Sequence, residues 1–251
     1  MLRAALLLCL VALPLRAEEV VLGLSKDRVA ITATFEGSDI LIFGAIKRET
    51  AIPEVPLDVI ITVAGPSRPA TVRRKERVLG IWVNTEAVDL DAAPTFYAVA
   101  TSGPLDAVLT ETEDLRHRVS IPRAIRSVGA ASMAGDVENF TEALIRIRKR
   151  TGAYQMLEDK VAFDQQTLFR TAISMPANLT EGAYRTRIFL TREGRVVSQF
   201  ETEIDVRKVG VERWLFTLSR QQPLLYGLMS LAIAIAAGWG ASAVFRVLRR
   251  S

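Results

Sequence analysis

Residues 193–206 read Glu-Gly-Arg-Val-Val-Ser-Gln-Phe-Glu-Thr-Glu-Ile-Asp-Val. From Val196 to Val206, apolar or small side chains alternate strictly with Gln199, Glu201, Glu203 and Asp205. A period of two is typical of a β-strand with one face buried and one in water. Glu193-Gly194 predicts a tight turn that joins this strand to the preceding run, Tyr184–Leu190. The stretch therefore predicts an antiparallel hairpin.

Similar short runs, separated by turn residues, occur over most of the chain. Val29–Phe35 and Ile40–Ile46 flank the turn sequence Glu36–Asp39, and we expect them to be partner strands. The other strands that we predict are Val20–Leu24, Leu57–Val63, Thr71–Arg77, Val78–Val83, Thr95–Ala100, Val161–Phe163 and Leu168–Met175. This pattern indicates a mainly β fold, with immunoglobulin-like antiparallel β-sandwich regions.

One helix interrupts the strands. Phe140, Ala143, Leu144 and Ile147 recur at helical spacing, with Asp136 as the expected N-cap and Gly152 after the end. The basic run at its C-terminal turns, Arg146 to Arg150, complements the helix dipole. We interpret this run, and Arg73-Arg74-Lys75, as solvated faces.

The C-terminus predicts a transmembrane helix. No charged residue occurs from Leu224 to Phe245, and 22 residues at about 1.5 Å each span roughly 33 Å, enough for a bilayer core. Pro223 suits the first helical position. The residues that we expect at the membrane interfaces are Trp214, Tyr226, Trp239, Arg246, Arg249 and Arg250. A ribbon of small side chains, at intervals of four residues, is a candidate for helix packing: Ser230, Ala234, Gly238 and Ser242.

The N-terminus has the pattern of a signal peptide. Arg3 precedes an apolar run, Ala4 to Leu15, which is too short to span a bilayer and is followed by Arg16-Ala17. Cleavage after Ala17 would remove Cys9, the single cysteine; an uncleaved N-terminal anchor is the alternative. With the arginines after the C-terminal helix, this predicts a bacterial inner-membrane, single-pass protein with a periplasmic body and a cytoplasmic C-terminus.

The predicted organisation is 1–17 signal peptide, 18–110 β-sandwich-like region, 111–208 helix plus β-hairpin region, 209–222 juxtamembrane segment, 223–246 transmembrane helix and 247–251 cytoplasmic stub. The formal net charge is +4, but without the basic residues of the two ends the body has 27 basic and 28 acidic residues. The basic excess thus belongs to targeting and anchoring. We expect no nucleic-acid partner.

Residues with the potential for catalysis are sparse. The single histidine, His117, has no Gly-x-Ser-x-Gly sequence to accompany it, and no spacing typical of a zinc site surrounds it. We interpret the carboxylates Glu111, Glu113 and Asp114, and the pair Asp89 and Asp91, as loop residues in contact with solvent. The sequence therefore predicts no catalytic, metal or cofactor residues, and no cofactor.

Three stretches carry a resemblance to a known family. They are residues 24–46 (LSKDRVAITATFEGSDILIFGAI), residues 168–184 with Leu168–Pro176 and Glu181-Gly-Ala-Tyr184, and the C-terminal helix with Tyr226-Gly227 and Gly238-Trp239. Over essentially the whole chain, the sequence resembles a family of alphaproteobacterial transmembrane proteins of unknown function. The family offers no catalytic residues. The resemblance implies, at most, a periplasmic accessory role beside a sulfite-exporter-type permease.

These observations predict a membrane-anchored periplasmic accessory or interaction protein without catalytic activity, in contact with the lipid bilayer and with an integral membrane permease. The alternative is a module that binds a small ligand or an envelope polymer, which requires a concave pocket with converging polar groups. An enzyme would require a buried, perturbed carboxylate or a serine within hydrogen-bond reach of His117.

Overall fold

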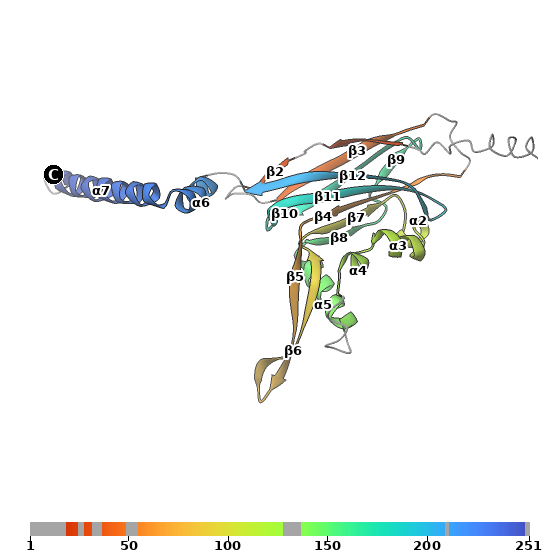
Figure 1. Ribbon diagram of the computed structural model, residues 1–251, viewed down its shortest axis with the longest axis horizontal. Helices are drawn as coiled ribbons and strands as arrows, with labels where there is room; N and C mark the ends of the chain where they lie inside the picture. The colour runs from red at the N-terminus through yellow and green to blue at the C-terminus, as the bar shows by residue number, and fades with distance from the viewer. Residues whose placement is uncertain are drawn as a thin grey trace, which may run out of the picture. The chain divides into compact units, whose positions relative to one another are not determined.

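The computed structural model describes residues 19–24, 28–31, 37–48, 55–127, 137–208 and 211–248, and it is mainly β (Figure 1). The predicted signal peptide, Cys9, the N-cap Asp136 and the arginines 249 and 250 lie outside these residues. The described strands form one sheet of six, one of four and one of two. The mainly β class predicted from the sequence is confirmed.

The six-stranded sheet lies at the centre of the body. Its strand order is β2 (Arg28–Ile31), β12 (Arg195–Lys208), β11 (Gly182–Arg192), β4 (Asp58–Ala64), β7 (Tyr97–Thr101) and β8 (Tyr154–Leu157). β4 is buried on both faces, since Val59, Ile60 and Ile61 are all fully buried. The sequence of a strand that is covered on both faces is typically a continuous run of apolar residues.

The four-stranded sheet has one buried face. Its order is β1 (Glu19–Leu24), β3 (Gly37–Lys47), β10 (Leu168–Pro176) and β9 (Ala162–Asp164). On β3, Ile40 and Ile42 are buried whereas Leu41 and Phe43 are exposed. The alternation along this strand was therefore a correct guide to its two faces.

The hairpin of β11 and β12 confirms the prediction from residues 193–206. Glu193 and Gly194 have φ of 51° and 72°, and Arg192 lies opposite Arg195. Two central residues with positive φ are typical of the tight turns that suit twisted hairpins. Ile204 and Val206 are buried, and Glu201 and Glu203 are exposed, as the alternation predicts.

The predicted pairing of Val29–Phe35 with Ile40–Ile46 is wrong. In the structure β3 pairs with β1 and β10, and β2 neighbours β12 at the edge of the other sheet. Strands from before and after residue 110 therefore share both sheets. The periodicity specifies which face of a strand is apolar, but it carries no information about which distant strand completes the ladder.

Helices cover one face of the six-stranded sheet. The predicted helix is α5 (Val137–Arg150), followed by Gly152 with φ of 71°. Three shorter helices that we did not predict precede it: α2 (Leu105–Val108), α3 (Glu111–His117) and α4 (Ile121–Ala124). The apolar core under them includes Ile60, Tyr97, Val99, Phe189, Val108, Val119, Ile121, Phe140 and Leu144.

A single arginine ties the end of α3 to the sheet. Arg187 of β11 donates through Nη1 to the carbonyl oxygen of His117 at 2.6 Å and through Nη2 to that of Arg118 at 3.1 Å. The buried hydroxyl of Tyr97 donates to the carbonyl oxygen of Val119 at 2.8 Å. These bonds satisfy carbonyls at the point where Arg118 takes a left-handed conformation, with φ of 52°.

The C-terminal part is helical and is described by itself. It consists of α6 (Val211–Gln221) and α7 (Pro223–Leu248), which begins at the predicted proline. Pro223–Ser242 is apolar and long enough to cross a membrane, and none of its residues is buried. An unburied segment of this length and composition is unfavourable in water and favourable in lipid.

Candidate interaction site

A long two-stranded hairpin projects from the β body (Figure 1). It consists of β5 (Ser67–Val78) and β6 (Ile81–Pro94), which pair antiparallel from Ser67↔Pro94 to Val78↔Ile81. Leu79 and Gly80 form the turn, with φ of 50° and 88°. The predicted strand Val78–Val83 is therefore wrong, because its middle is a turn and its ends belong to two strands.

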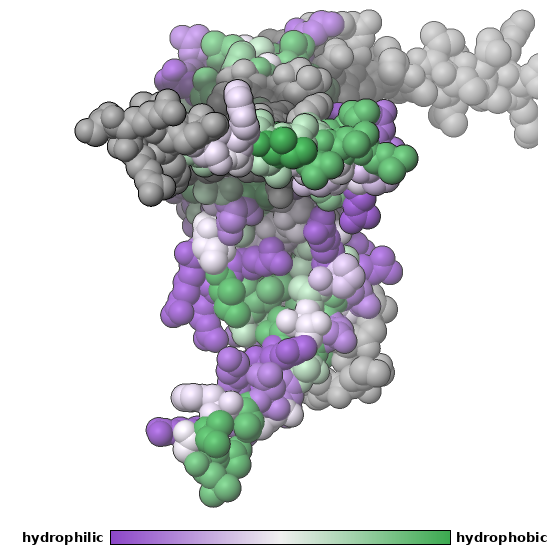
Figure 2. Space-filling view, turned by 90° about the vertical axis from the view of Figure 1, so that its left-hand side faces the viewer, coloured by the Kyte–Doolittle hydropathy of each residue, from purple (hydrophilic) through white to green (hydrophobic). Residues whose placement is uncertain are grey.

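The end of this hairpin is apolar and exposed. Leu79 is 99% exposed, Ile81 68% and Trp82 66%. Figure 2 shows the hairpin end as a hydrophobic cluster below a hydrophilic band. We refer to residues 78–83 as the tip. Contiguous apolar exposure rimmed by polar residues marks interaction sites on soluble domains.

The turn residue Leu79 is unfavourable in two independent ways. A leucine with positive φ is strained, and at turns of this kind asparagine or glycine is preferred. The same side chain is exposed to water, so it gains nothing from packing within the chain. A residue that stabilises neither the turn nor the core is better explained by a contact outside the chain.

Three basic residues near the end of the hairpin lie on one of its two faces. Side chains alternate along a strand, so Arg73, Lys75 and Arg77 share one face of β5. Trp82 lies directly opposite Arg77 in the register and therefore belongs to that face. Glu76 and Glu86 belong to the other face, where a carboxylate oxygen of Glu86 forms an ion pair with Nη1 of Arg74 at 2.8 Å. We call the first face, residues 73, 75, 77 and 82, the basic face.

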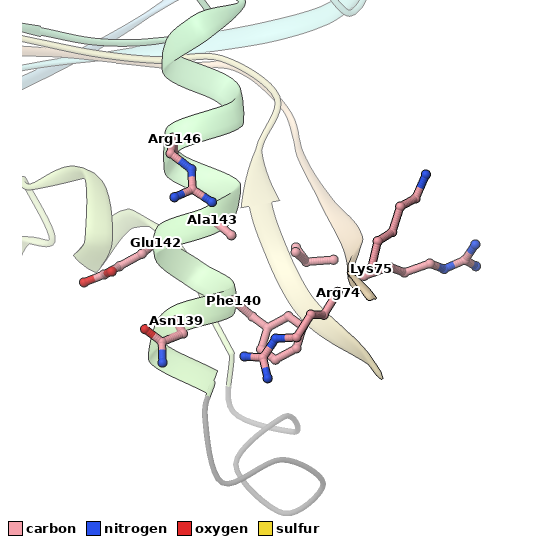
Figure 3. Close-up of a pocket in the computed structure, with 9 residues that line it drawn as sticks. Arg74, Lys75, Asn139, Phe140, Glu142, Ala143 and Arg146 are labelled. Carbon is pink, nitrogen blue, oxygen red and sulfur yellow. The ribbon is translucent and has the colours of Figure 1, made fainter. Parts of the chain in front are cut away.

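The other face of the hairpin rests on α5. The guanidinium of Arg74 lies over the ring of Phe140, 4.9 Å from its centroid, and Phe140 is buried. Figure 3 shows Arg74 directed toward Phe140 and Lys75 directed away from α5. A groove of about 370 Å³ separates the two elements, lined by residues that include Arg146, Asn139 and Glu142. The helix thus supports the hairpin and leaves its basic face exposed.

A second groove, of about 920 Å³, lies among α2, α3, α4 and α5. Two of its carboxylates already have backbone partners. Asp114 accepts the backbone N–H groups of Val119 at 3.0 Å and Ser120 at 2.7 Å, and Glu158 accepts that of Leu105 at 3.2 Å. These two carboxylates are therefore used to hold the short helices in place.

The interpretation of Glu111, Glu113 and Asp114 as loop residues is wrong, because all three lie on α3. Glu113 is buried; its Oε1 accepts from Arg116 at 2.8 Å, and its Oε2 lies 3.4 Å from Nε2 of His117. The imidazole of His117 also meets the ring of Phe189 edge-on, at 5.4 Å between centroids. His117 and Glu113 therefore pack α3 against the sheet.

The interpretation of Asp89 and Asp91 as loop residues is also wrong, because both lie on β6. The carboxylate of Asp89 accepts from the Thr71 hydroxyl at 2.5 Å.

Several of the predicted membrane residues lie on the described helices. Tyr226 and Trp239 are exposed on α7, and Ser230, Ala234, Gly238 and Ser242 lie along the same helix at the predicted spacing. The hydroxyl of Ser230 donates to the carbonyl oxygen of Tyr226 at 2.9 Å. The side chains of Trp214, on α6, and Arg246, on α7, are outside the described part of the structure.

Within the ranges that the structure describes, no group of three or more His, Cys, Asp or Glu side chains could hold a metal ion. The tip is the feature that sequence reasoning missed. Its signal was available: Leu79-Gly80 falls between two runs of alternating residues, and glycine favours the positive φ of a tight turn. The run Val78–Val83 contains no polar side chain, so its composition is also typical of a buried strand, and we predicted a strand there.

Comparison with known proteins adds one observation. The family model described as "Putative transmembrane protein (Alph_Pro_TM)" matches residues 19–247. The chain belongs to this family. The matched residues of this chain span the strands of the β body, the projecting hairpin and all but the last residue of α7. No curated protein matches the chain.

Proposed function

We propose that this member of the transmembrane family is an interaction protein of the bacterial envelope, without catalytic activity of its own. Its β body lies in the periplasm, α7 crosses the inner membrane, and its C-terminus is cytoplasmic. The hairpin tip makes contact with another component of the envelope. The exposed apolar tip, with Leu79 99% exposed, is the observation that carries this proposal.

Two features of the body support an interaction role over catalysis. His117 and Glu113, the residues with the greatest catalytic potential in the sequence, are used to pack α3. The hairpin is held in place by α5 through Arg74 and Phe140, so the tip is presented on a supported element. A preorganised surface loses less conformational entropy when it binds.

Association with a multispanning transporter is part of the same proposal. The small-residue ribbon on α7 would let a neighbouring helix approach closely in lipid. Gly238 belongs to the ribbon, whereas Gly240 lies two residues away on a different face, and a Cβ at either position would meet nothing within 4 Å in this chain. Gly238→Ile and Gly240→Ile are therefore a matched pair, both at positions where an added Cβ has open space in this chain.

The decisive experiment is photo-crosslinking in native membranes. A photoreactive amino acid is placed at Leu79, and in a matched control at Gln199, an exposed position on β12. We expect an adduct with an envelope component from position 79 and none from position 199. The absence of any adduct from position 79 would overturn the proposed role of the tip.

Two further measurements test the topology and the transporter. Gln199→Cys should react with a membrane-impermeant maleimide in spheroplasts, and Ser251→Cys only after lysis; the reverse pattern would overturn the orientation. For the transporter, an affinity tag on the chain should recover a multispanning protein from gently solubilised membranes. Gly238→Ile should reduce that recovery and Gly240→Ile should preserve it.

A further inference from the structure

The tip and the basic face lie on one hairpin. The apolar tip favours a lipid environment, and the cations of the basic face favour an anionic surface. We propose that the β5–β6 hairpin inserts its tip into the interface of a bilayer that contains anionic phospholipid, with Arg77 and Lys75 at the level of the headgroups. This inference rests on the proposed function and identifies what the tip contacts. It makes the hairpin a second membrane-binding element besides α7.

The composition of the tip fits a lipid interface. Trp82 is an amphipathic aromatic residue, which settles at the headgroup level, and Leu79 and Ile81 can reach the acyl chains beyond it. The tip itself contains no charged side chain, because Val78, Leu79, Gly80, Ile81, Trp82 and Val83 are all neutral. The two strands pair up to Val78↔Ile81, and the carbonyl oxygen of Gly80 accepts from Nε of Arg77 at 3.3 Å. The outward-facing backbone groups of this two-stranded element need water or headgroups as partners, which places the tip in the hydrated interface and not in the hydrocarbon core.

The spacing of the cations fits the depth of the headgroup layer. A strand rises about 3.3 Å per residue, so Arg77 and Lys75 lie about 7 Å and about 13 Å from the turn. The headgroup layer of one leaflet is roughly 5–8 Å deep. With Leu79 at the acyl boundary, the guanidinium of Arg77, whose Nε donates to the carbonyl oxygen of Gly80 at 3.3 Å, lies at the inner edge of the headgroup layer. The long side chain of Lys75 can extend down to the phosphates.

The arrangement of charge favours lipid over a protein pocket. Arg73, Lys75 and Arg77 share the face of Trp82, and Glu76 and Glu86 lie on the opposite face. Asp89, which lies opposite Thr71 on the face of the cations but farther from the tip, accepts from the Thr71 hydroxyl. An anionic membrane surface attracts every cation that faces it, without requiring a matched position for each. A pocket on a protein would have to combine an apolar cavity for Trp82 with acidic groups placed against each of the three cations.

The test uses the full-length chain with Trp214→Phe and Trp239→Phe, so that Trp82 is the remaining tryptophan. The protein is reconstituted in nanodiscs of equal parts phosphatidylcholine and phosphatidylglycerol, with lipids brominated near the headgroup end of the acyl chain. A second arm keeps the discs free of bromine and adds separate brominated vesicles of the same composition. We expect a blue-shifted Trp82 emission and bromine quenching in one of the two arms, which identifies the bilayer that is contacted. Water-like emission without quenching in both arms would overturn the inference.

Charge variants test the role of the basic face. The double variant Lys75→Gln with Arg77→Gln should weaken the partition of the tip by about fivefold per charge removed. The matched control, Lys160→Gln with Arg195→Gln, removes two exposed cations from elsewhere on the body and should leave quenching unchanged. Equal effects of the two double variants would mean that only net charge matters and would overturn the assignment to this face.

The crosslinker at Leu79 separates failure of this inference from failure of the proposed function. A lipid adduct together with quenching supports both. A protein adduct without quenching overturns the lipid assignment but retains the interaction role. The absence of both adduct and quenching overturns both.

Discussion

The guanidinium of Arg74 on β5 lies 4.9 Å from the centroid of the Phe140 ring on α5. Arg74 also pairs with Glu86 of β6, at 2.8 Å, so one side chain connects both strands of the hairpin to the helix that supports them. The hairpin therefore packs against α5, which supports both of its strands. This packing is what makes the position of the tip specific.

The Arg74–Phe140 contact should be measurable as a coupling energy. For Arg74→Gln and Phe140→Leu, we expect a double-mutant cycle to give about 0.5–2 kcal/mol in the free energy of unfolding, the range for a cation over an aromatic ring. The cycle of Arg74→Gln with Phe163→Leu, on β9, is the control and should be additive. Additivity in both cycles would show that the contact is energetically neutral.

Replacing the strained turn residue should stabilise the hairpin while impairing its contact. Asparagine tolerates the left-handed conformation of Leu79, so we expect Leu79→Asn to raise the free energy of unfolding by up to about 1 kcal/mol. The same variant should lower bilayer quenching of Trp82. Gly80→Ala should lower the free energy of unfolding. A Cβ there meets nothing within 4 Å, so the cost comes from the φ of 88° alone. Urea unfolding in detergent micelles measures both variants.

Arg187 should be far more important for stability than Arg185, although both are exposed to some extent on the same strand. Arg187→Met removes two charge-assisted bonds to the carbonyls of His117 and Arg118 and should cost about 2–4 kcal/mol. Arg185→Met breaks an ion pair with Glu201 whose side chains are 61% and 45% exposed, and should cost less than about 1 kcal/mol. Similar losses in the two variants would show that Arg187 acts only as a surface charge.

Buried tyrosines predict a loss of stability at high pH. Burial raises the pKa of Tyr97 from 10.0 to about 12, and burial likewise raises that of Tyr154 to about 12. Because the folded state holds these phenol protons more tightly than the unfolded chain, their stabilisation is complete below about pH 10 and declines as the pH rises to about 12. The denaturant midpoint of the natural sequence should fall as the pH is raised across this window. The midpoint of the Tyr97→Phe variant should fall less steeply. An identical slope in the variant would contradict the assignment to Tyr97.

The candidate site shows where local patterns mislead. In Val78–Val83 the apolar run has the appearance of a buried strand, yet Ile81 and Trp82 are two-thirds exposed. Hydrophobicity alone cannot separate a core strand from a membrane-facing or partner-facing tip, because both need apolar side chains. Likewise, Glu113 has the local context of a solvated loop, and its burial depends on His117, Arg116 and a sheet distant in the sequence.

The sequence by itself determined the features that depend on one segment at a time. These are the length and apolar character of α7, the alternating faces of β3 and β12, the Glu193-Gly194 turn and helix α5. Only the tertiary structure decided that β3 pairs with β10, that Arg187 ties α3 to the sheet, and that the hairpin projects with its cations on the face of Trp82. Periodicity encodes which side of a segment avoids water, whereas long-range pairing depends on shape and hydrogen-bond complementarity between segments that no single stretch contains.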